Sequence, residues 1–254
     1  MPNNSKNTMQ HITPYNLFEA SSGAFKPLLK TIEHLQGKEC VFITTSNRWD
    51  KEIPKSSELA EVIASMIDPK PRIFDAFKLK IYPCEGNVSH RDGNHCGEKK
   101  AIMKDKEKNP GNFLRCWASL NSPDDELWRI SKAIYEAEAI VFFGSIRWGS
   151  MNATYQKLLE RLTWIENRQS SLKESNPVKG KEAGLVVLGH NWRGKEVVQQ
   201  QREILEMFGF DTPKELFFNH QWTNEMYDES LKGYVKDSQE FDANIIDISD
   251  RIIQ

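Results

Sequence analysis

The stretch from Ala139 to Ala153 reads AIVFFGSIRWGSMNA and decides the fold. Its first half, AIVFFGS, is a continuous apolar run of strand length, typical of a central parallel strand buried on both faces. Its second half is a loop of small and polar residues that leads directly into an amphipathic helix. The apolar face of that helix consists of Tyr155, Leu158, Leu159 and Leu162. The stretch therefore predicts a strand, a loop and a helix in direct succession.

The same alternation extends in both directions along the chain. Apolar runs predict strands at 40–45, 77–82, 139–145, 184–189 and 215–218, and amphipathic periodicity predicts helices between most of them. Strands that alternate with helices form parallel sheets joined by right-handed crossovers, with helices on both faces. We therefore expect an α/β protein with a doubly wound, five-stranded parallel sheet of the flavodoxin-like class.

Three regions follow from this pattern. Residues 1–38 form an N-terminal extension with a short helix at 24–35, and residues 39–222 form the α/β domain. Within that domain, residues 83–121 have little periodicity and many charges, which indicates a long loop or insertion. Residues 223–254 contain no strand signal, and the spacing of their isoleucines predicts a C-terminal helical tail.

Composition excludes several classes of protein. The 254 residues contain 34 basic and 36 acidic side chains, a net charge of -2, without the basic excess that nucleic-acid binding needs. The apolar runs are far shorter than the roughly 20 residues that cross a bilayer, so no membrane span is expected. The first residues do not read as a secretory signal, which favours the cytoplasm, where the four cysteines would stay reduced.

Loops at the carboxyl ends of the strands are where open α/β sheets bind ligands. The loop after residue 45 combines hydroxyl groups and an arginine with the start of a helix, where free N–H groups and the helix dipole favour an anion. The candidate phosphate ligands are Ser46, Arg48, Ser56 and Ser57. The alternative is that Ser56 or Ser57 only caps the helix.

Two further loops would reach the same edge. In the second, small residues would let a flat ring approach the backbone, and Arg147 and Trp148 would flank that ring. Its candidates are Ser145, Ile146, Arg147, Trp148, Gly149, Ser150 and Met151. The third contributes His190 and Gly194, where glycine permits a close backbone approach. Taken singly, Trp148 could equally be a core or interface aromatic, and His190 an ordinary surface histidine.

These residues resemble the NADPH-dependent FMN reductase-like branch of the flavodoxin-fold proteins, which includes the iron–sulfur flavoproteins. The resemblance runs from about Cys40 to about Phe210, and its most specific part is GSIRWGSMNA followed by KLLERLTW, similar to the family's S-P-x-Y-W-G-S-M segment and its helix ending in D-R-L. Gly144 and Ser145 stand where the family has Ser-Pro, and Arg147 stands at its usual Tyr.

The resemblance implies bound FMN, with its phosphate at the first loop and its isoalloxazine edge along the backbone from Ile146 to Met151. It also implies hydride transfer from NADPH or NADH, electron delivery to a quinone, a flavin or another small-molecule acceptor, and a homodimer. Two alternatives stay open: a flavin-binding electron carrier reduced by a partner protein, and a relative of the fold that has lost FMN.

The cysteine pattern is the feature in which this sequence differs most from the iron–sulfur flavoproteins. A cubane cluster needs four converging thiolates, but Asn87 and His90 stand where two of them would be, between Cys84 and Cys96. A zinc site formed by Cys84, His90 and Cys96 with His95 or Cys116 is the remaining metal hypothesis. We expect no metal, because such incomplete ligand sets in polar loops are more often relics.

Overall fold

The computed structural model describes residues 26–48, 52–86, 96, 116–171, 173–189 and 193–221. The strands are β1 (Cys40–Thr44), β2 (Arg72–Asp75), β3 (Ala139–Arg147), β4 (Ser150–Met151), β5 (Glu182–Gly189) and β6 (Phe217–Gln221). The helices are α2 (Lys26–Leu35), α3 (Lys55–Ala64), α4 (Trp117–Asn121), α5 (Leu127–Glu136), α6 (Ala153–Leu162), α7 (Trp164–Ser170) and α8 (Gly194–Phe208), and a 3-10 turn, η1 (Lys214–Leu216), precedes β6.

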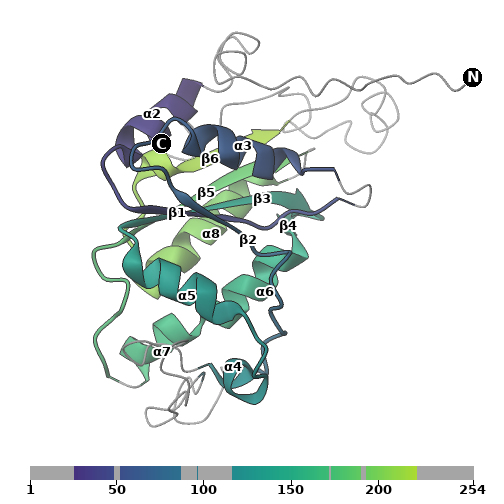
Figure 1. The fold of residues 1–254 in the computed structure, drawn as a ribbon, viewed down its shortest axis with the longest axis vertical. Helices are drawn as coiled ribbons and strands as arrows, with labels where there is room; N and C mark the ends of the chain where they lie inside the picture. Colours follow the sequence, from purple (N-terminus) through teal and green to yellow (C-terminus); the bar gives the residue numbers. More distant parts are fainter. Residues whose placement is uncertain are drawn as a thin grey trace, which may run out of the picture.

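Five of these strands form one parallel sheet in the order β2-β1-β3-β5-β6. The two-residue strand β4 is a sixth, and it pairs antiparallel with the end of β3. This is the strand order of the flavodoxin-like doubly wound class, so the predicted fold class is confirmed. Helices α2 and α3 lie on one side of the sheet, whereas α5, α6 and α8 lie on the other (Figure 1).

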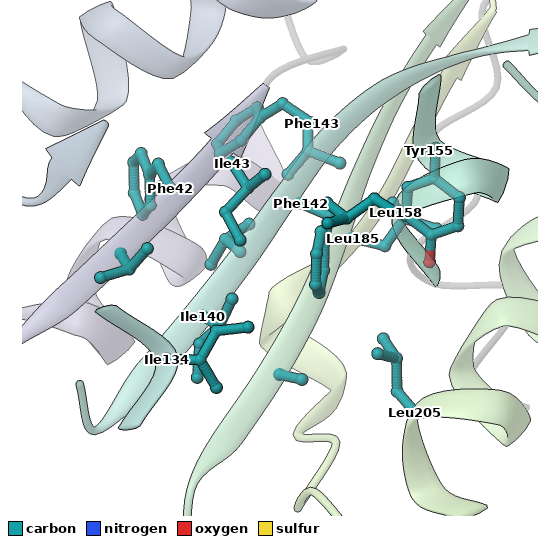
Figure 2. Packing of buried hydrophobic residues seen from close by; sticks show 14 of the residues in the cluster. Phe42, Ile43, Ile134, Ile140, Phe142, Phe143, Tyr155, Leu158, Leu185 and Leu205 are labelled. Atoms are coloured by element: carbon teal, nitrogen blue, oxygen red, sulfur yellow. The ribbon is translucent and has the colours of Figure 1, made fainter. Parts of the chain in front are cut away.

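Alternating side chains of the central strands fill both layers of the core (Figure 2). Phe142 faces α6, where its ring meets that of Tyr155 edge-on with the centroids 5.6 Å apart. Phe143 faces the opposite side and packs against Phe42, with the centroids 4.9 Å apart. All four side chains are almost completely buried. The continuous apolar run of β3 is therefore explained by its central position, because both of its faces are covered.

The strand predicted at 77–82 is wrong, because the edge strand is β2, at residues 72–75. In the predicted segment the backbone N–H of Lys80 donates to Glu126 (2.8 Å) and that of Tyr82 to Asp125 (3.0 Å). Side-chain carboxylates thus accept hydrogen bonds from these N–H groups, in place of the backbone carbonyls of a neighbouring strand. A short strand with charged ends is tolerated at β2 because an edge strand is only half covered.

The remaining regional predictions have mixed outcomes. Helix α2 lies within the helix predicted at 24–35, and α4 lies within the predicted insertion 83–121. The helix predicted to begin at Ser122 begins at Leu127, since the carboxyl groups of Asp125 and Glu126 bind the 80–82 backbone instead. The predicted tail at 223–254 lies outside the described residues. No described helix has both the length and the apolar composition that a bilayer span requires.

Candidate functional site

Three loops converge at the carboxyl edge of the sheet. Strands β1, β3 and β5 are adjacent and parallel, so their carboxyl ends lie at the same edge. From these ends the chain passes to α3, α6 and α8 respectively. Helix α3 leaves β1 toward one side of the sheet and α6 leaves β3 toward the other (Figure 1). The edge between β1 and β3 is therefore the topological switch point, where such sheets bind their ligands.

Helix α3 begins without a side-chain cap. Its N-cap is Pro54, which makes no capping hydrogen bond and has no N–H group of its own. The first N–H groups of the helix, at Lys55 and Ser56, precede the intrahelical hydrogen-bond ladder and need an acceptor from elsewhere. With the helix dipole they make this terminus a site for an anion. The interpretation of Ser56 or Ser57 as a cap is therefore wrong.

A row of hydroxyl groups connects this terminus to β3. Ser56 Oγ donates to Ser46 Oγ (2.9 Å), and Ser46 Oγ donates to Ser145 Oγ (3.2 Å). Beside them, Ser57 Oγ is buried and has no hydrogen-bond partner among the described residues. An unsatisfied buried hydroxyl costs about 1–3 kcal/mol, so its position calls for a partner that the described residues do not provide.

Two cationic side chains lie near the same terminus. Arg48 Nη2 is 3.2 Å from Glu52 Oε2, and Lys55 Nζ is 2.8 Å from Glu58 Oε2. Both pairs are partly exposed, so each holds its cation only weakly in place. The four predicted phosphate ligands, Ser46, Arg48, Ser56 and Ser57, thus lie on the loop and first turn of α3. Trp49–Lys51 lie outside the described residues.

The second loop is a tight hairpin between β3 and β4. Ile146 pairs with Met151 and Arg147 with Ser150, which leaves Trp148 and Gly149 as the two turn residues. Both have positive φ angles, 51° and 69°, as a type I′ turn requires. The Trp148 side chain is 92% exposed, so the interpretation of this residue as a core aromatic is wrong. The hairpin places an unshielded aromatic ring at the switch-point edge.

Asn152 ties the first two loops together, a role that the sequence analysis missed. Its Nδ2 donates to the carbonyl of Thr45 (2.6 Å), and its Oδ1 lies 3.0 Å from Thr45 Oγ1 and 3.4 Å from the Ser145 N–H. Gly144 lies beneath this contact. A Cβ atom there would lie 2.6 Å from the terminal methyl of Met151, which can move, and 3.0 and 3.1 Å from Thr45 Oγ1 and Asn152 Oδ1, so a side chain at this position would crowd the hydrogen-bonded contact.

The third loop is described only in part. Strand β5 ends at Gly189, and α8 begins at the buried Gly194 after Arg193, whose φ is 62°. His190 lies outside the described residues. Gly194 is at the predicted edge, because β5 lies beside β3 in the sheet.

The cysteines do not form a metal site among the described residues, where no group of three or more His, Cys, Asp or Glu side chains could hold an ion. His90 and His95 of the zinc hypothesis lie outside the described residues. All four cysteines are free thiols.

The sheet order defines a flavodoxin-like protein, and a helix terminus without a side-chain cap lies at its switch point. The sequence profile of the NADPH-dependent FMN reductase family matches residues 97–224, and the chain belongs to this family. The family's cofactor is FMN and its electron donor is NADPH, so the class is that of flavin-dependent oxidoreductases. The match includes β3, the hairpin and α8, but not the α3 terminus.

Several solved structures align with this chain at low sequence identity. The structure of RosB with bound 8-demethyl-8-formylriboflavin-5'-phosphate aligns with 14% identity and a TM-score of 0.50, over 71% of this chain and 64% of that chain. This chain thus spans less than two thirds of RosB. The Trp repressor binding protein from Bacillus subtilis aligns with 16% identity and a TM-score of 0.42, over 85% of this chain and 99% of that one. No curated protein sequence matches the chain significantly.

Proposed function

We propose that this protein is a cytoplasmic, NAD(P)H-dependent FMN oxidoreductase that passes electrons to a small-molecule acceptor, with the FMN phosphate at the start of α3. The Ser57 hydroxyl carries this proposal, because it is buried at an uncapped helix terminus and has no hydrogen-bond partner within the described part of the chain. A phosphate there would accept hydrogen bonds from Ser46, Ser57 and the first helical N–H groups, with Arg48 as the countercharge.

The isoalloxazine would lie along the hairpin. The backbone from Ile146 to Met151 forms the rim of the edge, and Ser145 joins that rim to the phosphate loop through Ser46. Trp148 would shield one side of the ring from water, and Arg147 would place a positive charge near it. His190 and Gly194 would border the ring on the β5 side.

FMN, when bound, supplies the atom that accepts a hydride from the nicotinamide and later returns two electrons to a second acceptor. The chain's own contribution is to bind and orient the two substrates and to exclude water from between them. Hydride transfer requires no general acid or base, which agrees with a site built from hydroxyls, backbone and one arginine. The hairpin's exposed position leaves room for an acceptor to approach.

Anaerobic titration tests this function. The purified protein is saturated with FMN and mixed with NADPH or NADH, and the flavin absorbance near its long-wavelength maximum is followed. We expect loss of that absorbance, and its return when a quinone or free flavin is added. An FMN complex that neither nucleotide bleaches, but that a chemical reductant does, would instead favour an electron carrier. A protein that binds no flavin would favour the relative of the fold that has lost FMN.

We further propose that the protein forms a homodimer. Trp148 is 92% exposed and Ile53 is 65% exposed, and both belong to loops at the carboxyl edge. Exposed apolar groups of this kind are typical of surfaces that another molecule covers. Sedimentation equilibrium should give twice the mass of the chain, whereas a monomer at all concentrations would contradict this part of the proposal.

A further inference from the structure

A buried arginine lies on α6, in the helical layer that also contains α5 and α8 (Figure 1). Arg161 of α6 is completely buried and forms a two-pronged ion pair with Asp125, with N–O distances of 2.7 and 3.0 Å. Its guanidinium also donates to Ser119 Oγ (2.7 Å) and to the Tyr82 carbonyl (2.7 Å). The remaining donor, Nε, points at Cys116 Sγ at 3.3 Å. One cysteine sulfur is therefore part of a buried charge network.

A second cysteine contacts the first. The side chains of Cys96 and Cys116 are hydrogen-bonded, and each residue is only 2% exposed. Cys116 thus receives hydrogen bonds from two donors, the Cys96 thiol and Arg161 Nε. These donors lower the pKa of Cys116, whereas donation to Cys116 and burial raise the pKa of Cys96. The pair is asymmetric: Cys116 has the more acidic sulfur, and Cys96 keeps its proton.

The other two cysteines have different surroundings. Cys40 is also buried, but its thiol faces the Leu35 carbonyl at 3.9 Å, and burial raises its pKa to about 12. Cys84 is half-buried, and its sulfur accepts the Gly86 N–H at 3.4 Å. Cys40 is therefore an internal reference for a buried thiol whose pKa stays high even though the positive charge of Lys38 acts to lower it.

The balance of charges around the thiol pair favours its oxidation to a disulfide. A thiolate at Cys116 would share Arg161 with Asp125, so the three groups together would carry one net negative charge in a buried place. A disulfide to Cys96 is neutral and would remove that charge. The same arginine argues against a metal, because a guanidinium beside the sulfur repels a cation.

We propose that Cys116 and Cys96 are a redox-active thiol pair that a hydroperoxide oxidises reversibly to a disulfide. The Cys116 thiolate attacks one oxygen of hydrogen peroxide, which breaks the O–O bond, gives a sulfenic acid and releases hydroxide. The Cys96 thiol then attacks that sulfur, which forms the S–S bond and releases water. A dithiol returns both cysteines to thiols and becomes a disulfide itself. These steps do not involve the flavin site.

Thiol mapping on the folded full-length protein tests the proposal. Protein treated with hydrogen peroxide is quenched with acid, alkylated with N-ethylmaleimide, digested and analysed by mass spectrometry. We expect the Cys96 and Cys116 peptides to be joined with the loss of two hydrogens, and dithiothreitol to separate them. Cys116 should be oxidised more than about tenfold faster than Cys40, because the thiolate is the reactive form.

Three variants assign the roles. With Cys96→Ser, oxidation should stop at a Cys116 sulfenic acid that dimedone captures; with Cys116→Ser, Cys96 should stay a thiol. Cys40→Ser is the matched control and should form the disulfide at the rate of the unchanged protein. Circular dichroism checks that each variant is folded, and the mapping of the unchanged protein stands even if one of them is not.

Two results would overturn the proposal. One is a folded protein in which Cys96 and Cys116 remain thiols and become oxidised only in urea. The other is a disulfide that joins Cys84 to either of them in preference to the proposed pair.

Discussion

Ser57 combines burial with an unpartnered hydroxyl, and the phosphate proposal depends on it. The change Ser57→Ala should weaken FMN binding about ten- to a hundredfold, because a hydrogen bond to a charged group is worth about 1.5–3 kcal/mol. The free energy of unfolding of the flavin-free protein should not fall, since no contact within the described residues is lost. Quenching of flavin fluorescence on titration measures the affinity.

Ser65→Ala is the matched control for that change. Ser65 follows the last residue of the same helix, and its hydroxyl donates to the Val62 carbonyl (2.7 Å). Its removal should leave FMN affinity unchanged. Equal affinities for all three proteins would show that the α3 terminus does not hold the phosphate.

Asp125 should make stability depend on pH. Burial acts to raise its pKa, but Arg161 and the N–H groups of Tyr82 and Leu127 outweigh burial and hold it below its usual value. The ion pair thus stabilises the fold above the unfolded pKa of about 3.9, and that contribution is lost as pH falls through the lower folded pKa. Asp125→Asn should cost about 3–5 kcal/mol at neutral pH, because it leaves a buried arginine unpaired.

Urea unfolding at neutral and acidic pH measures this difference, which should shrink as the pH falls. Asp124→Asn is the control, because Asp124 is the exposed neighbour that pairs with Lys80. A gap between Asp125→Asn and the unchanged protein that stays constant across the acidic range would contradict the assignment.

Residue-level prediction from sequence depends on local signals. Ser46, Ser56 and Ser57 were predicted as phosphate ligands because hydroxyls near a helix start are recognisable from their neighbours in the chain, and the structure brings Ser46 and Ser56 into hydrogen-bond contact. Asn152 and Arg161 were not identified, since their partners lie 107 and 36 residues away in the sequence. Nothing in the local sequence pattern distinguishes an asparagine that joins two loops from one that begins a helix.

Asn152 links the loops that follow β1 and β3 at the carboxyl ends of these strands. Asn152→Ala removes the hydrogen bonds to Thr45 and leaves buried polar groups without partners, which should lower the free energy of unfolding by about 1–3 kcal/mol. FMN affinity should fall as well, because the phosphate loop and the hairpin lose their common link. Urea unfolding and flavin titration measure the two effects, and loss of stability with full affinity would contradict the positioning role.

The hairpin stores backbone strain. Trp148 has a φ of 51°, which an aromatic residue rarely adopts and asparagine adopts readily. Trp148→Asn should therefore raise the free energy of unfolding by about 1 kcal/mol, while it weakens FMN binding. Arg147→Asn, one residue earlier in β3, is the control and should give no gain in stability. A Trp148→Asn protein with unchanged affinity would show that the ring does not contact the flavin.

Element-level prediction depended on how far each element is buried. The central strands β1, β3 and β5 contain continuous apolar runs and were recognised. Strand β2 was misplaced, because an edge strand with charged ends has no continuous apolar run. The segment at 77–82 alternates apolar and charged residues, which is the pattern of a half-buried strand. Helix α5 begins at Leu127 and not at Ser122, where the capping signals predicted its start, because the Asp125 carboxylate pairs with Arg161.

At the scale of the whole molecule, the strand order fixes where a ligand can bind. The alternation of elements predicts the flavodoxin-like doubly wound class but no particular strand order, and the observed order β2-β1-β3-β5-β6 places the three candidate loops at one edge. The family match agrees with this architecture. The acceptor could not be predicted in the same way, because it depends on the loops and on any second subunit rather than on the sheet.

Parallel titration with FMN and riboflavin tests the central claim most directly, because the two ligands share the ring system and differ by the phosphate. The account predicts one FMN per chain, bound at least about a hundredfold more tightly than riboflavin, since several charge-assisted hydrogen bonds at the α3 terminus would be absent for riboflavin. Equal affinities for the two ligands, or no binding of FMN, would contradict it.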